Sequence, residues 1–240
     1  MVLAAGLGTR MRPLTDTLPK PLIKVAGKAL IDWTLDRFAA AGVTRAIVNV
    51  HYRADQMEEH LRTRRDLEII ISDERALLLE TGGGLKKARA QLGERPVFCT
   101  NTDAILVDEG VEPCALLADA WRDETMDALL LLAPLEAASG YDGKGDFDLA
   151  GDRPSWRTGE QAGYVFTGLQ IIRPALLDGA PEGPFSTRLL WDKAMAADRT
   201  RAIVHRGPWM HVGDPQGLAI ADAFFDKMTD VEKRKARLSV

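Results

Sequence analysis

The chain has 240 residues, 46% of them apolar, and a formal net charge of −4. This composition suffices for one large α/β core, and the mild acidity argues against general nucleic-acid binding. No run of about 18 apolar residues predicts a membrane span, and no charged leader precedes the first apolar run. With only two cysteines, we expect a cytoplasmic protein without disulfides.

Strand and helix patterns alternate along the chain. Apolar, β-rich runs predict strands at residues 2–5, 46–50, 67–72, 96–100, 128–133, 164–172 and 202–205. Amphipathic patterns predict helices at residues 29–41, 54–64, 84–92, 113–122, 186–197 and 215–225. This alternation predicts an α/β fold with a doubly wound, mostly parallel sheet. Ligands bind at the carboxyl ends of such strands, so the loops after the first, second and fourth strands are expected to share one rim.

The second half of the chain changes character. Residues 139–160 are rich in Gly, Asp, Ser and Arg, which predicts a β-hairpin with a mobile loop. We expect one domain over residues 1–225, with a small embedded β lobe at about residues 139–200. Residues 226–240 form a charged helical pattern and predict a C-terminal helical tail.

The loop after the first strand has the composition of a phosphate site. Gly6 and Gly8 permit close backbone approach to a phosphate, and Arg10, Arg12 and Lys20 supply cations. Residues 1–31 hold five basic side chains against one acidic side chain. A glycine turn without any phosphate is the alternative, since the spacing fits neither the dinucleotide fingerprint nor the P-loop.

The motifs of the chain resemble those of the sugar-1-phosphate nucleotidyltransferases, which join a nucleoside triphosphate to a sugar 1-phosphate. The resemblance covers about residues 1–225 and implies a Rossmann-like nucleotidyltransferase fold with a sugar-facing lobe. The matching motifs, in family order, are LAAGLGTRMRPLT (3–15), PKPL (19–22), ETGGG (80–84), NTD (101–103), FTG (166–168) and WMHVG (209–213).

Within that family the chain most resembles the N-acetylmuramate-1-phosphate uridylyltransferases of bacterial cell-wall recycling. This implies transfer of a nucleoside monophosphate, most simply from UTP, to N-acetylmuramic acid 1-phosphate with release of pyrophosphate. The alternatives are a guanylyltransferase acting on heptose or mannose 1-phosphate, and a non-catalytic homologue that binds nucleotide sugars. The sequence leaves the oligomer open between a monomer and a homodimer.

The resemblance assigns roles to individual residues. Catalysis falls to Arg10, Lys20 and Asp103, with Lys20 meeting either the leaving pyrophosphate or the α-phosphate. The nucleotide-binding residues are expected to be Ala4, Ala5, Gly6, Gly8, Thr9, Arg12, Thr81, Gly82, Gly83 and Asn101. The sugar-facing residues are expected to be Glu80, Thr167 and Gly168. No Ser-His-Asp set is found or needed, because a sugar phosphate is already anionic.

Two further segments have competing interpretations. Asp142 and Gly143 lie in a flexible stretch that either closes over the sugar or forms an exposed hairpin tip. His51 follows the second strand, where it either touches the site or is a hydrogen-bonded structural residue.

A metal site is predicted at Asp103, which follows an apolar strand. A carboxylate there is a suitable ligand for Mg²⁺, although an Asp after a strand also often caps a loop. The family normally supplies a second carboxylate two residues before a glycine, where this chain has His211. Imidazole suits Mn²⁺ better than Mg²⁺. Either His211 ligates the metal, or it holds a metal-bound water or phosphate, or Asp214 replaces it; Asp214 is better explained as a helix N-cap.

Overall fold

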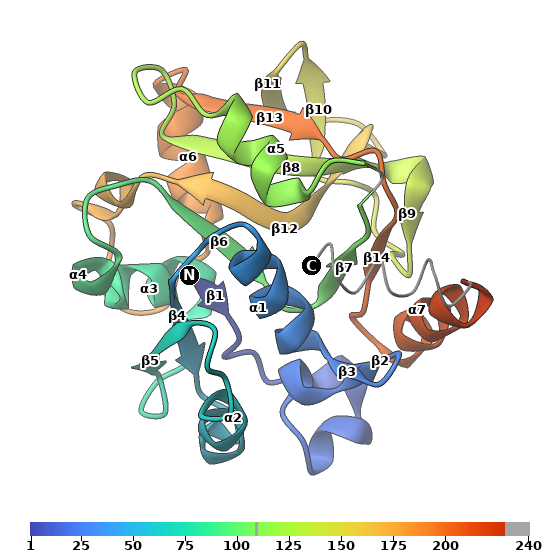
Figure 1. Cartoon of the computed structure of the whole chain (residues 1–240). Helices are drawn as coiled ribbons and strands as arrows, with labels where there is room; N and C mark the ends of the chain where they lie inside the picture. Colours follow the sequence, from blue (N-terminus) through green and yellow to red (C-terminus); the bar gives the residue numbers. More distant parts are fainter. Residues whose placement is uncertain (109, 229–240) are drawn as a thin grey trace.

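The computed structural model describes residues 1–108 and 110–228. Through this part of the chain runs a nine-stranded sheet with the order β11-β10-β12-β6-β1-β4-β5, and β8 and β13 continue it beside β12 (Figure 1). Its strands are β1 (Val2–Leu3), β4 (Arg45–Val50), β5 (Glu68–Asp73), β6 (Val97–Asn101), β8 (Ala128–Pro134), β10 (Phe147–Ala150), β11 (Arg153–Trp156), β12 (Tyr164–Ile172) and β13 (Thr200–Val204).

Parallel pairing dominates the half of the sheet that begins at the N-terminus. Strands β6, β1, β4 and β5 are parallel neighbours, with Val2 opposite both Val48 and Thr100. The α/β fold and its mostly parallel central sheet are therefore confirmed. Strand β12 runs antiparallel to β6 and β8, a reversal that the strand–helix alternation did not predict. It pairs with β8 on both sides of a bulge between Phe166 and Gln170.

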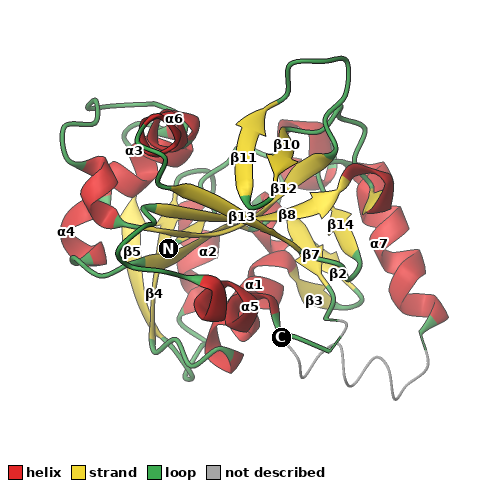
Figure 2. Cartoon of the chain, turned by 90° about the horizontal axis from the view of Figure 1, so that it is seen from above, coloured by secondary structure: helices red, strands yellow, loops and turns green. Residues whose placement is uncertain are grey.

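Helices cover both faces of the sheet (Figure 2). Strand β8 shows why, because Leu129 and Leu131 face one buried cluster while Leu130 and Leu132 face another. Helices α1, α2 and α5 pack in the first cluster, and α3, α4 and α6 pack in the second. The helices are α1 (Leu30–Ala40), α2 (Ala54–Leu61), α3 (Glu80–Lys87), α4 (Arg89–Leu92), α5 (Pro113–Ala120), α6 (Arg188–Ala196) and α7 (Pro215–Lys227).

Most predicted elements are found within a few residues of their expected bounds, and two helices begin elsewhere. The helix expected from residue 84 begins at Glu80, so the three glycines lie inside α3 rather than before it. The helix expected after an N-cap at Ser186 begins at Arg188, and its N-cap residue is Thr187. The first difference changes the site, because helical glycines present little free backbone to a ligand.

Short strands that the sequence did not predict build the region beside the main sheet. Strand β14 (Trp209–His211) pairs with β7 (Ala104–Leu106) and with β9 (Ala138–Ser139). Strands β2 (Lys24–Val25) and β3 (Lys28–Ala29) form a separate two-stranded ribbon. Helix α7 packs against β14 and β2, which holds the C-terminal motif next to the N-terminal one.

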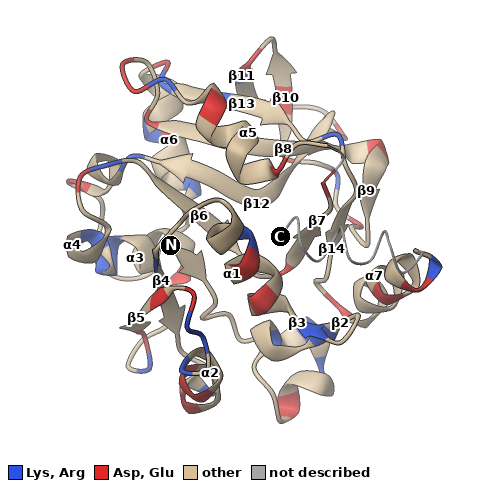
Figure 3. Cartoon of the chain, in the orientation of Figure 1, with Lys and Arg blue, Asp and Glu red and all other residues tan. Residues whose placement is uncertain are grey.

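The predicted hairpin in residues 139–160 is present as β10 and β11, which join the main sheet through β12. The predicted tail begins within α7, and residues 229–240 lie outside the described residues. No helix in the described ranges is long and apolar enough to cross a membrane. Lys and Arg alternate with Asp and Glu over many elements rather than gathering on one face (Figure 3).

Candidate active site

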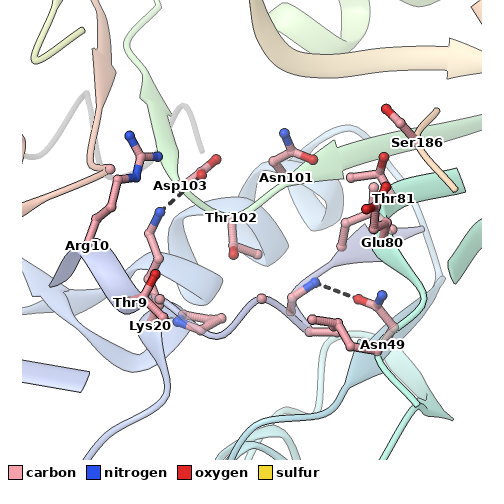
Figure 4. Close-up of a pocket in the computed structure, with 18 residues that line it drawn as sticks. Thr9, Arg10, Lys20, Asn49, Glu80, Thr81, Asn101, Thr102, Asp103 and Ser186 are labelled. Atoms are coloured by element: carbon pink, nitrogen blue, oxygen red, sulfur yellow. Dashed lines mark hydrogen bonds and ion pairs between the residues drawn. The ribbon is translucent and has the colours of Figure 1, made fainter. Parts of the chain in front are cut away.

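A cleft of about 470 Å³ lies at the carboxyl ends of β1, β4 and β6, as the parallel pairing predicts. Arg10, Lys20 and Asp103 stand at one end of it, and Glu80, Thr81 and Ser186 stand at the other (Figure 4). The lining residues are Leu3, Ala4, Ala5, Gly6, Gly8, Thr9, Arg10, Lys20, Pro21, Asn49, Leu78, Glu80, Thr81, Asn101, Thr102, Asp103, Ser186 and Gly213.

The glycine loop brings Lys20 into the cleft. Gly8 has a φ of +64°, and a Cβ at this position would lie 2.9 Å from the Cβ of Lys20 and from the Cγ2 of Thr15. Thr15 fixes the same turn, because its hydroxyl donates to the carbonyl of Gly8 at 2.8 Å. Gly8 is thus required both for its backbone conformation and for the close passage of the Lys20 stem.

Lys20 and Asp103 form an ion pair inside the cleft. The ammonium Nζ lies 3.0 Å from Asp103 Oδ2, and the two side chains are 12% and 30% exposed. Burial raises the pKa of Asp103, but the positive charge of Lys20 and the His211 imidazole outweigh it and hold that pKa well below its usual range. Asp103 is therefore a carboxylate at neutral pH.

His211 reaches the same carboxylate from β14. Its Nε2 lies 3.8 Å from Asp103 Oδ2, because β14 pairs with β7 so that His211 stands opposite Ala104. Gly213 permits this placement, since a Cβ there would overlap the imidazole ring. The prediction that Asp214 is a helix N-cap is confirmed: its Oδ1 accepts the amide of Gly217 at 2.8 Å.

The donor set at this end fits a hard divalent cation that is shared with phosphate oxygens. Within the described ranges, no group of three or more His, Cys, Asp or Glu side chains is arranged to hold a metal. Asp103 Oδ2 contacts Lys20 and His211, whereas Oδ1 has no partner among the described residues. Mg²⁺ commonly binds through one or two carboxylates plus substrate phosphates, and a carboxylate oxygen without a protein partner suits that arrangement.

Two of the glycines expected to face the base lie outside the cleft. Gly82 and Gly83 are buried in α3, and their amides donate to the carbonyl of Phe185 at 2.8 and 3.1 Å. A Cβ on Gly82 would overlap the ring of Phe185. These glycines thus serve close packing, and their N–H groups are not free for a ligand. Glu80 and Thr81, at the start of the same helix, do line the cleft.

The expected sugar-facing residues are also arranged differently from the prediction. The hydroxyl of Thr167 is buried and donates to the carbonyl of Leu131 at 2.8 Å, so it ties β12 to β8. Gly168 has a φ of +95°, and a Cβ at this position would lie 3.4 Å from the Cβ of Asn101, which lines the cleft. Asp142 and Gly143 lie outside the lining, in the loop before β10.

Two other candidates are paired away from the cleft. Arg12 is exposed and lies 3.4 Å from Asp16, and it is absent from the cleft lining. The Nδ1 of His51 lies 2.7 Å from the carbonyl of Glu74, which is the structural interpretation of this histidine.

Sequence reasoning missed several residues of the cleft. Asn49 lies on its floor, where its Oδ1 accepts the amide of Ala4 at 2.6 Å. Ser186 lines the end opposite the ion pair, beside Thr81, whose hydroxyl accepts the amide of Thr187 at 2.9 Å. The one available signal was a polar residue inside an otherwise apolar strand, at Asn49. The other missed lining residues are Leu3, Pro21, Leu78, Thr102 and Gly213.

Comparison with known proteins agrees with this geometry. A profile of the nucleotidyl transferase family matches residues 1–143. The chain belongs to this family. An N-acetylmuramate α-1-phosphate uridylyltransferase of Caulobacter vibrioides is 48% identical over 229 residues, which cover 93% of this chain and 95% of that protein. The enzyme of the same name from Neisseria meningitidis serogroup B is 36% identical, over 93% of this chain and 96% of that protein.

More distant matches extend over other members of this family. A mannose-1-phosphate guanyltransferase of Yarrowia lipolytica is 30% identical, over 90% of this chain and 61% of that protein. A solved structure of a putative glucose-1-phosphate thymidylyltransferase from Bacillus anthracis has a TM-score of 0.81 at 13% identity, covering 95% of each chain. At that identity the likeness concerns the fold alone, and it confirms the predicted nucleotidyltransferase fold.

Proposed function

We propose that this nucleotidyltransferase transfers uridine monophosphate from UTP to the phosphate of N-acetylmuramic acid 1-phosphate and releases pyrophosphate. The observation that carries the proposal is the cleft in which Arg10, Lys20 and Asp103 gather at one end, in a chain 48% identical to an enzyme named for this substrate. The reaction fits the cell-wall recycling that the sequence resemblance implies. The two buried, unpaired cysteines fit a cytoplasmic location.

The chemistry requires positioning and charge neutralisation rather than a general base. A sugar phosphate oxygen is already negatively charged, so it attacks the α-phosphorus of UTP directly and the bond to the leaving pyrophosphate breaks. Arg10 and Lys20 neutralise the negative charge that develops on the transferring and leaving phosphates. Both side chains line the cleft, and Lys20 is held near the reacting end by its contact with Asp103.

A divalent cation completes the charge balance in this proposal. Members of the nucleotidyl transferase family typically use such an ion. Asp103 would hold Mg²⁺, with His211 as a second ligand or as a partner of a bound water or phosphate. When bound, the ion would supply positive charge to the phosphate oxygens.

The nucleobase is proposed to lie against the backbone of residues 4–6. Uracil presents an acceptor–donor–acceptor edge that backbone N–H and C=O groups satisfy without side chains. No Asp or Glu occurs in residues 4–8 to pair with the donor edge of guanine. Glu80 does line the cleft, however, and this observation supports a guanylyltransferase as the second candidate.

The sugar is proposed to lie at the same rim, facing the lobe at about residues 139–200. The lactyl carboxylate of muramic acid needs a cation, and Lys144 and Arg188 are exposed candidates. The guanidinium of Arg188 lies 4.1 Å from the ring centre of Trp156, which holds it at the start of α6, two residues after Ser186 of the cleft.

A matrix of the four common triphosphates against a panel of sugar 1-phosphates tests this function, with pyrophosphate release as the measurement. We expect the highest kcat/KM for UTP with N-acetylmuramic acid 1-phosphate. A preference for GTP with a heptose or mannose phosphate would replace the proposed substrates by those of the second candidate. Absence of divalent-dependent pyrophosphate release from every pair would indicate a nucleotide-sugar-binding protein without catalysis.

A further inference from the structure

A buried chain of hydrogen bonds connects the two walls of the cleft. The amide of Ala4 donates to Asn49 Oδ1 at 2.6 Å, and Asn49 Nδ2 donates to Glu74 Oε1 at 2.7 Å. The other oxygen of Glu74, Oε2, accepts the amide of Leu79 at 3.2 Å. Asn49 is 2% exposed and Glu74 is fully buried, so the first two bonds are sheltered from water and the bond to Leu79 is partly buried.

The two ends of this row of hydrogen bonds belong to opposite walls of the cleft. Ala4 lines the cleft at the start of the glycine loop, and Asn49 lines its floor at the end of β4. Leu79 lies between Leu78 and Glu80, which line the other wall. Glu74 is itself held in place, because its amide donates to the carbonyl of Val50 at 2.8 Å.

The Asn49 side chain replaces a backbone hydrogen bond where the pairing of β1 with β4 ends. Strands β1 and β4 pair at Val2 and Val48, and the amide of Ala4 binds the Asn49 side chain instead of a backbone carbonyl. The side chain thus satisfies a buried donor while the two strands separate. Helix α3 closes over the pair at Gly84, where a Cβ would lie 2.8 Å from Glu74 Oε1 and 2.9 Å from Asn49 Nδ2.

The hydrogen bonds from Ala4 to Leu79 have a fixed order of donors and acceptors. Two amides donate at its ends, and a carboxamide between them accepts from one side and donates to the other. A carboxylate offers only acceptors and therefore satisfies both of its neighbours. A carboxamide in place of Glu74 would set an N–H₂ group against a donor at one of the two contacts.

We propose that Asn49 and Glu74 are positioning residues for the nucleotide. They set the distance between the glycine loop and residues 78–81, and the nucleoside binds in the space between these two segments. The proposal rests on the proposed function only in that the cleft binds a nucleoside triphosphate. Neither residue moves a proton or neutralises phosphate, so both contribute equally to the binding of the substrate and of the transition state. Their loss raises KM and Kd for the triphosphate and leaves kcat and the KM of the sugar phosphate nearly unchanged.

Three variants test the donor–acceptor order. Glu74→Gln introduces a donor–donor contact, and Asn49→Asp sets two carboxylates against each other. In the double variant Asn49→Asp/Glu74→Gln, the new carboxylate accepts from the Ala4 amide and from the new carboxamide. The carboxamide oxygen in turn accepts from Leu79, so every contact is satisfied again. We expect each single variant to raise KM and Kd for UTP about 10-fold or more, and the double variant to return to within about 3-fold of wild type.

A matched control separates positioning from loss of stability. Leu117→Ala removes a fully buried side chain of α5 away from the cleft, and we expect a lower Tm with unchanged KM for UTP. The proposal is overturned if the single variants lower Tm in the same way while KM and Kd for UTP stay at the wild-type value. It is equally overturned if the double variant is no better than the single variants.

Gly84→Ala provides a test that keeps both polar residues, should a single variant not fold. Its methyl group presses on the Asn49–Glu74 contact, while Ala improves the propensity of α3. We expect a raised KM for UTP, whereas Leu117→Ala lowers Tm without this change, and an unchanged KM in Gly84→Ala would contradict the proposal. If the wild-type protein prefers another triphosphate, the same measurements are made with that one. The proposed substrate would then be wrong, and the positioning role would still be tested.

Discussion

Lys20 Nζ lies 3.0 Å from Asp103 Oδ2, so the cation expected to meet phosphate neutralises the carboxylate expected to hold a metal. Lys20 follows Pro19 near the N-terminus, and Asp103 follows β6, so the contact joins two family motifs at one end of the cleft. In the proposed reaction both groups take other partners. In this structure the pairing keeps either charge from being buried alone.

Replacing Asp103 tests the metal assignment. Asp103→Asn keeps the size of the side chain but removes its charge, and we expect kcat to fall by about 10²-fold or more in Mg²⁺. The variant should bind Mn²⁺ more weakly than wild type in the presence of a non-hydrolysable triphosphate, as measured by electron paramagnetic resonance. A near-normal rate with Mg²⁺ would exclude Asp103 as the metal ligand.

Arg10 and Lys20 are expected to act on turnover. Arg10→Ala and Lys20→Ala each remove a cation that meets charge developing in the transition state, so kcat should fall more than KM rises. Steady-state kinetics with both substrates measures this division. Arg12→Ala is the matched control, since Arg12 is exposed, pairs with Asp16 and does not line the cleft. Equal losses in Arg10→Ala and Arg12→Ala would show that general loop charge matters rather than position.

His205 gives the protein a pH-dependent stability away from the cleft. Burial, with a smaller contribution from nearby Arg37, lowers the pKa of this imidazole from 6.5 to about 4, against the hydrogen bond to the Pro208 carbonyl. The folded state therefore favours neutral His205. The contribution of neutral His205 to the free energy of unfolding is complete above pH 6.5. It is lost as the pH falls toward 4, because in this range only the unfolded chain takes up the proton.

We expect this group to remove about 2 kcal/mol of unfolding free energy between about pH 7.5 and about pH 5. His205→Gln, which does not titrate, should lose correspondingly less over the same range. Urea unfolding of both proteins at the two pH values measures the difference. An identical loss in both would mean that His205 is protonated without penalty in the folded state.

The sequence predicted the end of the cleft at Arg10, Lys20 and Asp103 better than the end at Glu80 and Thr81. The loop with Arg10 follows β1 and Asp103 follows β6, and the parallel order of these strands brings their carboxyl ends together, so the meeting of these two residues follows from the topology. Gly82 lies in a packed helix rather than in the expected turn, because glycine serves both backbone contact with a ligand and close helix packing, and the sequence alone does not distinguish the two uses. The ring of Phe185, about a hundred residues away, decides between the two uses.

Short strands and buried polar contacts were beyond the sequence patterns. Strand β14 has three residues, too few for an alternating pattern, yet its pairing places His211 beside Asp103. Asn49 and Glu74 are 25 residues apart, and nothing in either local segment indicates that they meet. Both contacts depend on long-range pairing, which local propensity does not contain.

His211→Asp tests the departure of this chain from the family pattern. The Nε2 of His211 is 3.8 Å from Asp103 Oδ2, so a carboxylate at this position would face the metal ion that we propose at Asp103. If His211 is a metal ligand, the substitution should preserve or raise activity with Mg²⁺ and reduce any preference for Mn²⁺. Rates measured over a titration of each ion give the comparison, with His211→Ala as the control that leaves no ligand at this position. Unchanged rates and metal preference in both variants would make His211 a bystander and leave Asp103 as the single protein ligand that the described residues offer.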